Sequence, residues 1–333
     1  MDNVAIQIDS QHSWTGFYQK LADKLLAYRN DRQTLISMLN DAYSRTGMQL
    51  PKLEADELND IDPFTVFGLF NKGITDANRR KIIAVIAEVF DIGADQPTDF
   101  EGIPVLNNLN ATFYAFANDE RRSEHDIDNL WSVFEAELAL DADDSEENRK
   151  AFVDAFDATV IQFSLGWKLT MGLYWARPYS FISLDSRNRW FMADVAKAGS
   201  AIANAVPKEK DSPVHDGERY LVICDTIKSE LRSEECPYTD FPSLTAAAFV
   251  ESERVNQERK AAEKAAAVKA EENALGDEGI RTTHYWTYSP GDGAARWDDF
   301  YARGIMGIGW SKLGNVEQYV SKEDIRKSLR TLY

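Results

Sequence analysis

The chain is poor in the residues that make covalent cross-links and metal sites. Its 333 residues include only two cysteines, Cys224 and Cys236, and four histidines. Two cysteines cannot build the disulfide framework of a small secreted protein, and none of these residues has the spacing of a zinc ligand set. We therefore predict no disulfide framework and neither a metal nor a cofactor bound by this chain.

The chain also lacks an excess of basic residues, a long apolar run and a leader sequence. It carries 37 Lys and Arg against 55 Asp and Glu, a formal net charge of -18, which argues against a protein that binds nucleic acid over its whole surface. Any DNA contact must then use a local basic or aromatic site. Because no apolar run has transmembrane length and the N-terminus lacks a signal sequence, we predict a cytoplasmic protein without membrane contact.

A glycine-rich phosphate loop is missing as well. An NTPase motor of the P-loop class needs G-x-x-x-x-G-K-[ST], whose lysine reaches the β- and γ-phosphates, and the sequence contains no such run. Gly291 and Gly293 belong to a turn. This chain by itself is therefore not predicted to be an enzyme that hydrolyses GTP or ATP.

Hydrophobic periodicity predicts a mainly helical domain over residues 1–249, with room for a small β element. The 8 Trp, 13 Tyr and 17 Phe are enough for buried cores. Ser13 is a candidate cap for the first helix, which Gly47 ends after a break near Asn30. Phe181, Ile182 and Leu184 favour a short buried strand. The predicted helices are 14–46, 76–89, 109–116, 126–140, one that opens at Ser145, and 220–232.

Residues 251–275 are rich in Ala, Glu and Lys and contain no aromatic residue. Glu and Lys at helical spacing predict an exposed helical connector of roughly 37 Å, at 1.5 Å per residue. A coiled-coil seam is the alternative, but apolar a and d positions are missing. The predicted domains are the helical domain at 1–249, a charged helical linker at 250–280 and a further domain at 281–333.

The last domain opens with an aromatic block, HYWTYSPGDGAARWDDFYARGIMGIGW, from His284 to Trp310. Aromatic and β-branched residues favour strands at 285–288 and 305–310. Between them, 289–293 has turn composition, and 294–303 has helical periodicity up to Gly304.

This block resembles the start of the EVE-type, PUA-like domain of McrB-like proteins, which are AAA+ NTPases of modification-dependent restriction systems. The shared pattern is YW-x-Y-[SA]-PG, then W-x-x-F-Y-x-x-G-I-M-x-IGW, then LG-x-x-x-Q-Y-x-SK-x-x-I, over 285–325. The resemblance implies an incomplete α/β barrel at 281–333, and we interpret Tyr333 as a truncation.

The resemblance also implies a base-binding pocket formed by Trp286, Tyr288, Ser289 and Trp310. Such a pocket holds a modified base, here expected to be a modified cytosine, by stacking and by hydrogen bonds to the base edge. The alternative is that these side chains only fill the barrel, as we expect for Trp297.

Three upstream segments, 61–75, 100–116 and 169–192, are similar to the N-terminal part of the same proteins. This similarity implies modified DNA as a partner and an AAA+ motor downstream of Tyr333 that uses GTP or ATP with Mg. It further implies a nuclease subunit of McrC type that binds through the motor. Because such motors assemble as rings, we expect an oligomer only where the motor is present.

The segment LDSRNRW suggests a second, polar site. Asp185, Arg187 and Arg189, with Arg177 upstream, form a candidate phosphate site because a guanidinium grips phosphate with two hydrogen bonds. Two alternatives stay open. Asp185 fits the N-cap of a helix that starts at Ser186, and a carboxyl in an aromatic setting can have the raised pKa of a catalytic base.

Three functions are compatible with these features. The first is the DNA-recognition region of an McrB-like restriction NTPase. The second is an acidic helical scaffold that docks a partner of a defence complex without touching DNA, favoured if Arg177, Arg187 and Arg189 form no contiguous basic groove. The third is a base-excision enzyme that uses Asp185, which requires an open pocket and a carboxylate without saturating partners.

Overall fold

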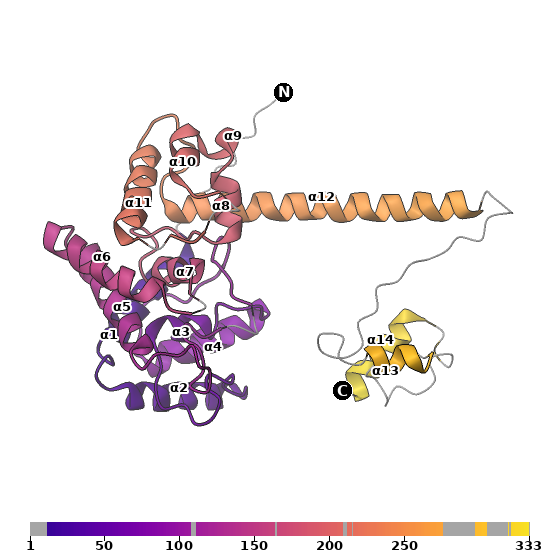
Figure 1. Ribbon diagram of the computed structural model, residues 1–333, viewed down its shortest axis with the longest axis horizontal. Helices are drawn as coiled ribbons and strands as arrows, with labels where there is room; N and C mark the ends of the chain where they lie inside the picture. The colour runs from indigo at the N-terminus through magenta and orange to yellow at the C-terminus, as the bar shows by residue number, and fades with distance from the viewer. Residues whose placement is uncertain are drawn as a thin grey trace. The chain divides into compact units, whose positions relative to one another are not determined.

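The computed structural model describes residues 12–107, 111–163, 165–208, 212–214, 216–275, 297–304, 319 and 321–332. Helices dominate these residues (Figure 1), and the only β pairing among them is an isolated parallel bridge between Lys72 and Leu106. The helices are α1 (Ser13–Leu26), α2 (Arg32–Thr46), α3 (Pro63–Gly68), α4 (Asp76–Val89), α5 (Asp126–Ala142), α6 (Glu146–Val160), α7 (Trp167–Ala176), α8 (Ser186–Met192), α9 (Val195–Ala198), α10 (Ser200–Ala205), α11 (Gly217–Leu231), α12 (Phe241–Leu275), α13 (Trp297–Ala302) and α14 (Lys322–Leu332).

The chain divides into two compact units, Met1–Ala261 and Ala262–Tyr333, and α12 runs from the first into the second. The connector expected at 251–275 is thus the distal part of a longer helix. Its first turns belong to the core of the first unit, because Phe241, Leu244 and Ala248 are buried there.

The predicted α/β barrel at 281–333 is wrong. Of these residues, the structure describes 297–304, 319 and 321–332, and they contain helices α13 and α14 and no strand. The local chemistry at α14 is helical: the Ser321 hydroxyl accepts a hydrogen bond from the Asp324 N–H at 3.2 Å, as an N-cap does. Ile325 and Leu329 then recur at helical spacing. The strands expected at 285–288 and 305–310 lie outside the described residues.

The prediction that Trp297 lies in a core is also wrong. Trp297 and Tyr301 stack on each other on α13 with 6.0 Å between ring centroids, yet their side chains are 47% and 77% exposed. Helical spacing correctly placed the two rings on one face. It could not say whether anything covers that face.

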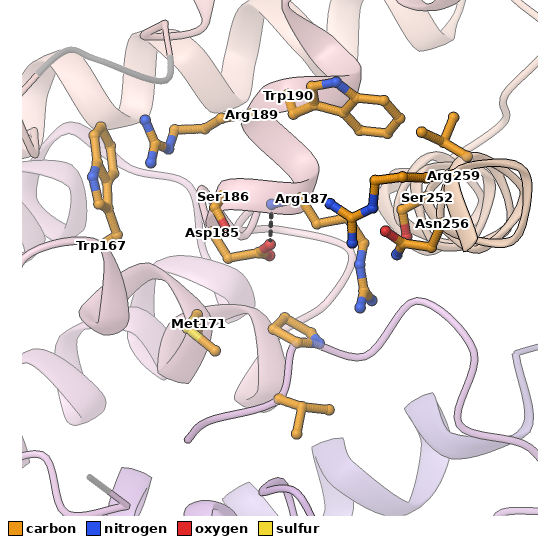
Figure 2. A pocket seen from close by; sticks show the side chains of 13 residues that line it. Trp167, Met171, Asp185, Ser186, Arg187, Arg189, Trp190, Ser252, Asn256 and Arg259 are labelled. Carbon is orange, nitrogen blue, oxygen red and sulfur yellow. Dashed lines mark hydrogen bonds between the residues drawn. The ribbon is translucent and has the colours of Figure 1, made fainter. Parts of the chain in front are cut away.

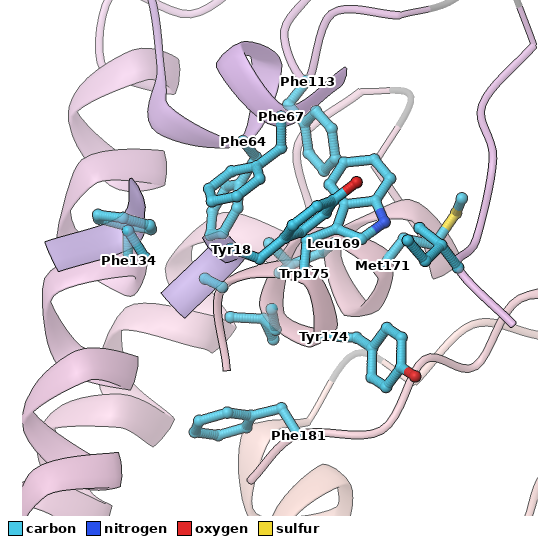
Figure 3. Close-up of a cluster of buried hydrophobic side chains, with 14 of the residues drawn as sticks. Tyr18, Phe64, Phe67, Phe113, Phe134, Leu169, Met171, Tyr174, Trp175 and Phe181 are labelled. Carbon is cyan, nitrogen blue, oxygen red and sulfur yellow. The ribbon is translucent and has the colours of Figure 1, made fainter. Parts of the chain in front are cut away.

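The core of the first unit is built around α7, whose residues from Lys168 to Ala176 are all buried. Figure 3 shows aromatic side chains from several segments gathered around it, among them Tyr18, Phe64, Phe67, Phe113 and Trp175. Gly172 permits this packing, since a Cβ there would lie 2.6 Å from the Phe64 ring. With α7 enclosed, the two residues at its ends, Trp167 and Arg177, are held in fixed places.

Most helices of the first unit lie where hydrophobic spacing predicts them. The helix expected over 14–46 is present as α1 and α2, and Gly47, at φ +68°, ends α2. Asp31 caps α2 by accepting from the Thr34 N–H at 3.3 Å. Ser13 is not the predicted cap, because its hydroxyl donates to Asp99 at 2.5 Å.

Two local predictions fail where side chains take over backbone hydrogen bonds. The described part of 109–116 is not helical: the Phe113 N–H donates to Thr65 Oγ1 at 2.9 Å instead of to a helical carbonyl. Phe181, Ile182 and Leu184 are buried as expected but form no strand, and the Leu184 N–H donates to Thr170 Oγ1 at 2.9 Å.

Candidate functional site

A pocket of about 750 Å³ lies in the first unit, between α7, α8, α12 and the loop at Pro104 (Figure 2). Three of its lining residues are arginines and one is an aspartate, in a chain whose net charge is -18. The pocket is therefore a locally positive region with aromatic and aliphatic walls. The lining residues are Pro104, Val105, Trp167, Met171, Asp185, Ser186, Arg187, Arg189, Trp190, Ser252, Val255, Asn256 and Arg259.

The loop wall is fixed from both sides. The indole N–H of Trp175 donates to the Pro104 carbonyl at 3.1 Å, which ties the loop to α7. Gly102 sets its distance from α12, because a Cβ at this residue would lie 2.6 Å from the backbone nitrogen of Ala246. Val105, 42% exposed, is left facing the pocket.

Asp185 is the N-cap of α8, as one of the two sequence interpretations predicts. One of its carboxylate oxygens accepts from the Arg187 and Asn188 N–H groups at 2.9 and 3.2 Å. The other accepts from the Ser183 hydroxyl at 2.8 Å and the Asn188 amide at 2.6 Å. Burial raises the pKa of this carboxyl, and these hydrogen bonds oppose the increase.

These partners limit what Asp185 can do. A general base needs a free lone pair aimed at its substrate, and both oxygens of Asp185 are already engaged by neighbours on its own helix or just before it. The carboxylate therefore holds the start of α8 in place, and α8 in turn positions Arg187, Arg189 and Trp190.

Arg189 is a structural member of the wall. Its guanidinium lies 3.9 Å from the centroid of the Trp167 ring, and it donates to the carbonyls of Leu184 and Lys208 at 2.9 Å each. Only 4% of the surface of Arg189 is exposed. Its guanidinium adds positive charge to the pocket wall, while its N–H groups donate to backbone carbonyls of the protein.

Arg187 is differently placed. Its guanidinium lies 4.9 Å from the centroid of the Phe249 ring, a cation–π contact that leaves the planar N–H groups at its edge unused. Within the part of the chain that the structure describes, this guanidinium has neither a hydrogen bond nor an ion pair. A half-buried arginine that lines a pocket and whose planar N–H groups are not engaged is suited to bind an anion.

Arg177, the fourth residue of the predicted polar site, is not in the pocket. It ends α7 at the opposite side and is buried against α1 and α5, where it pairs with Asp23 and, at 2.8 Å, with Asp141. It also faces Glu137, whose carboxyl is buried without a hydrogen-bond partner among the described residues and whose pKa is raised well above its ordinary value by burial. Arg177 therefore has a structural role in the core, where it pairs with carboxylates of α1 and α5.

The predicted base-binding residues Trp286, Tyr288, Ser289 and Trp310 lie outside the described residues. For the described ranges, no group of three or more His, Cys, Asp or Glu side chains is placed to hold a metal ion. Likewise, none of the helices described is both long and apolar enough to cross a membrane.

Comparison with known proteins places the chain in a family. A family model described as "Domain of unknown function (DUF8425)" matches residues 14–251. The chain belongs to this family. No curated protein and no solved structure matches it. The family region contains the pocket residues of α7, α8 and the Pro104 loop, and it ends one residue before the pocket residues of α12.

Three of the thirteen residues that line the pocket were predicted from the sequence. The LDSRNRW segment supplied Asp185, Arg187 and Arg189, but Trp190 in the same segment was passed over, as was Trp167. Asn256 and Arg259 were not predicted, because they lie in the segment interpreted as an exposed helical connector. The available signal there was Val255, a large apolar residue in a charged helix, which marks the side of α12 that lines the pocket.

Proposed function

We propose that the pocket binds the phosphate group of a nucleotide, either free or as part of a nucleic acid strand. The observation that carries this proposal is the Arg187 guanidinium, which lines the pocket and contacts the Phe249 ring but has neither a hydrogen bond nor an ion pair among the described residues. A guanidinium group binds phosphate through two parallel charge-assisted hydrogen bonds, a geometry that a lysine ammonium group does not offer.

The charge of the lining favours an anion. The lining contains Arg187, Arg189 and Arg259 and a single carboxylate, Asp185, which is occupied at the helix start. In an acidic chain such a local excess of positive charge directs an anionic ligand to one place.

The rest of the lining suits a nucleoside. Trp190, Val105 and Val255 offer aromatic and aliphatic surface, and the amide of Asn256 offers both a donor and an acceptor. The volume of about 750 Å³ is in the range typical of small-ligand pockets.

The resemblance to McrB-like proteins supports nucleic acid as the source of the nucleotide. Two of the resembling segments, 100–116 and 169–192, contribute Val105, Arg187 and Trp190 to the pocket. We therefore propose that this helical unit is a recognition region of a restriction NTPase of that type. Motor and nuclease activities would come from other parts of the system.

Replacing Arg187 with glutamine is expected to weaken ligand binding about tenfold or more. A hydrogen bond to a charged group contributes about 1.5–3 kcal/mol, and 1.4 kcal/mol corresponds to a factor of ten in Kd. The measurement is isothermal titration of the full chain with inorganic phosphate, deoxycytidine monophosphate and a short single-stranded DNA. Arg232→Gln is the matched control, since Arg232 is exposed and lies after α11, outside the pocket.

The titrations separate the two ligand sources. Tighter binding of the DNA than of the mononucleotide, with an affinity that falls steeply as salt rises, indicates a nucleic acid strand. Equal affinities indicate a free nucleotide. Binding that survives in Arg187→Gln, or that is lost equally in Arg232→Gln, contradicts the proposed site.

The scaffold function is the second candidate, and one observation favours it. Arg177 is buried away from Arg187 and Arg189, so the three do not form one basic groove. The test is the same titration together with a pull-down on the full chain. No binding of any phosphate ligand, with specific capture of a protein that Arg187→Gln does not affect, favours the scaffold.

A further inference from the structure

One stripe of α12 faces the pocket. Ser252, Val255, Asn256 and Arg259 all line it, and their spacing of i, i+3, i+4 and i+7 places them on one side of the helix. Figure 2 shows Asn256 and Arg259 reaching from α12 toward the side chains of α8. The pocket therefore has two walls that come from separate helices, one rich in arginine from α8 and one from α12.

The stripe lies where α12 changes from buried to exposed. Ahead of it, Phe241, Leu244 and Ala248 are buried, and Lys197 of α9 pairs with Glu251 at 3.4 Å. Beyond it, residues 260–266 are all exposed. The pocket is thus the last place along α12, among the residues whose side chains are described, at which the helix lines part of the first unit.

We infer that Asn256 and Arg259 form the second half of the ligand site, so that a bound phosphate-bearing ligand bridges α8 and α12. This inference rests on the proposed function. The Asn256 side chain is half-buried and has no hydrogen bond within the described residues, so its amide N–H is ready to donate to a phosphate oxygen. Arg259 brings a second guanidinium from the same wall, opposite Arg187.

Such a bridge makes the local opening of α12 depend on whether the ligand is bound. A helical segment that is exposed on all sides is only marginally stable in water and opens locally. A ligand held by Arg187 on one side and by Asn256 and Arg259 on the other adds contacts just where the exposed segment begins. Occupancy of the pocket therefore favours the closed, helical state of α12 over its opened state.

Hydrogen exchange measured by mass spectrometry on the full chain tests this coupling. With deoxycytidine monophosphate at ten times its Kd, exchange in peptides spanning 250–262 is expected to slow by up to about tenfold, because an opening that breaks the bridge releases the ligand. Peptides from α2, which is remote from the pocket lining, are expected to keep their exchange rates.

Two variants on α12 sharpen the test. Asn256→Ala is expected to weaken binding of the nucleotide about tenfold and to remove the protection of 250–262 at the original ligand concentration. Glu253→Ala, on an exposed position of the same helix, is expected to change neither. Circular dichroism of both variants checks that α12 remains helical.

The outcomes separate the inference from the proposed function. If the nucleotide binds in a manner that needs Arg187 but leaves exchange in α12 unchanged, the bridge is refuted and the phosphate site stands. If the nucleotide does not bind the wild-type chain at all, both are refuted. Protection of α12 that survives Asn256→Ala with unchanged affinity also overturns the role of the α12 wall.

Discussion

Replacing Gly102 with alanine is expected to lower the free energy of unfolding by about 3 kcal/mol or more. The added Cβ would lie 2.6 Å from the backbone nitrogen and 2.9 Å from the Cα of Ala246. These are backbone atoms of α12, which cannot rotate away. In addition, Gly102 has φ +76°, a conformation that costs an L residue about 1 kcal/mol, and overpacking adds roughly 1–3 kcal/mol.

Urea denaturation of Gly102→Ala beside Gly16→Ala measures this effect. Gly16 is an exposed residue in α1 with open space around its Cα, so alanine there should stabilise the protein by about 0.5–1 kcal/mol. Opposite signs for the two variants are the expected result. A loss below about 1 kcal/mol in Gly102→Ala would show that the loop and α12 are not packed as described, and the loop wall of the pocket would then lack its support.

The second large effect concerns pH. Relative to the wild type, Asp62→Asn should gain about 3 kcal/mol of stability between about pH 4 and pH 7. Asp62 is fully buried at the start of α3, and burial raises the pKa of its carboxyl from 3.8 to about 6. Thr65 donates to it, Lys168 of α7 faces it, and its charge also acts on Tyr114.

The direction follows from which state holds the proton more tightly. Because the folded-state pKa is the higher one, the contribution of Asp62 to stability is complete below about pH 4 and is lost as pH rises through about 6. Each pKa unit corresponds to about 1.4 kcal/mol, and asparagine keeps the cap without titrating.

Unfolding free energies at several pH values, with the wild type subtracted, isolate this residue from other titrating groups. The difference between Asp62→Asn and the wild type is expected to rise with pH. A flat difference would mean that Asp62 is hydrated in the folded protein.

The helical layout of the first unit could be predicted from local patterns because most of its helices bury one side. In α5, Leu130, Trp131, Phe134 and Leu138 recur at helical spacing and are all buried. Caps such as Ser145 and Asp185 follow from residue type alone. The 111–116 segment could not be predicted in this way, because its backbone bonds to Thr65, a partner far away in the sequence.

The pocket was only partly predictable for the same reason. Arg187 and Arg189 are close in the sequence, so their shared position on α8 is a local property. Whether Arg177 lies near them depends on the tertiary position of α7, which places Arg177 on the far side from the pocket, beside Asp141. The contribution of α12 depends on a helix that docks from about seventy residues further along the chain, a distance over which periodicity carries no information.

At the barrel predicted for 281–333, a local pattern was interpreted as a fold that the described residues do not form. Aromatic and glycine spacing in the 284–310 block predicted a strand, a turn, a helix and a second strand. The helix is present as α13, whereas both predicted strands lie outside the described residues. The cap at Ser321 and the helical repeat after it are local signals that favour α14.

A crystal structure of the full chain with deoxycytidine monophosphate would show whether the pocket binds a nucleotide phosphate. We expect the phosphate within hydrogen-bonding distance of the Arg187 guanidinium, with Asn256 or Arg259 on its other side and the nucleoside against Trp190 or Val255. Nucleotide bound elsewhere on the protein, with Arg187 making no contact to it, would refute the proposed site.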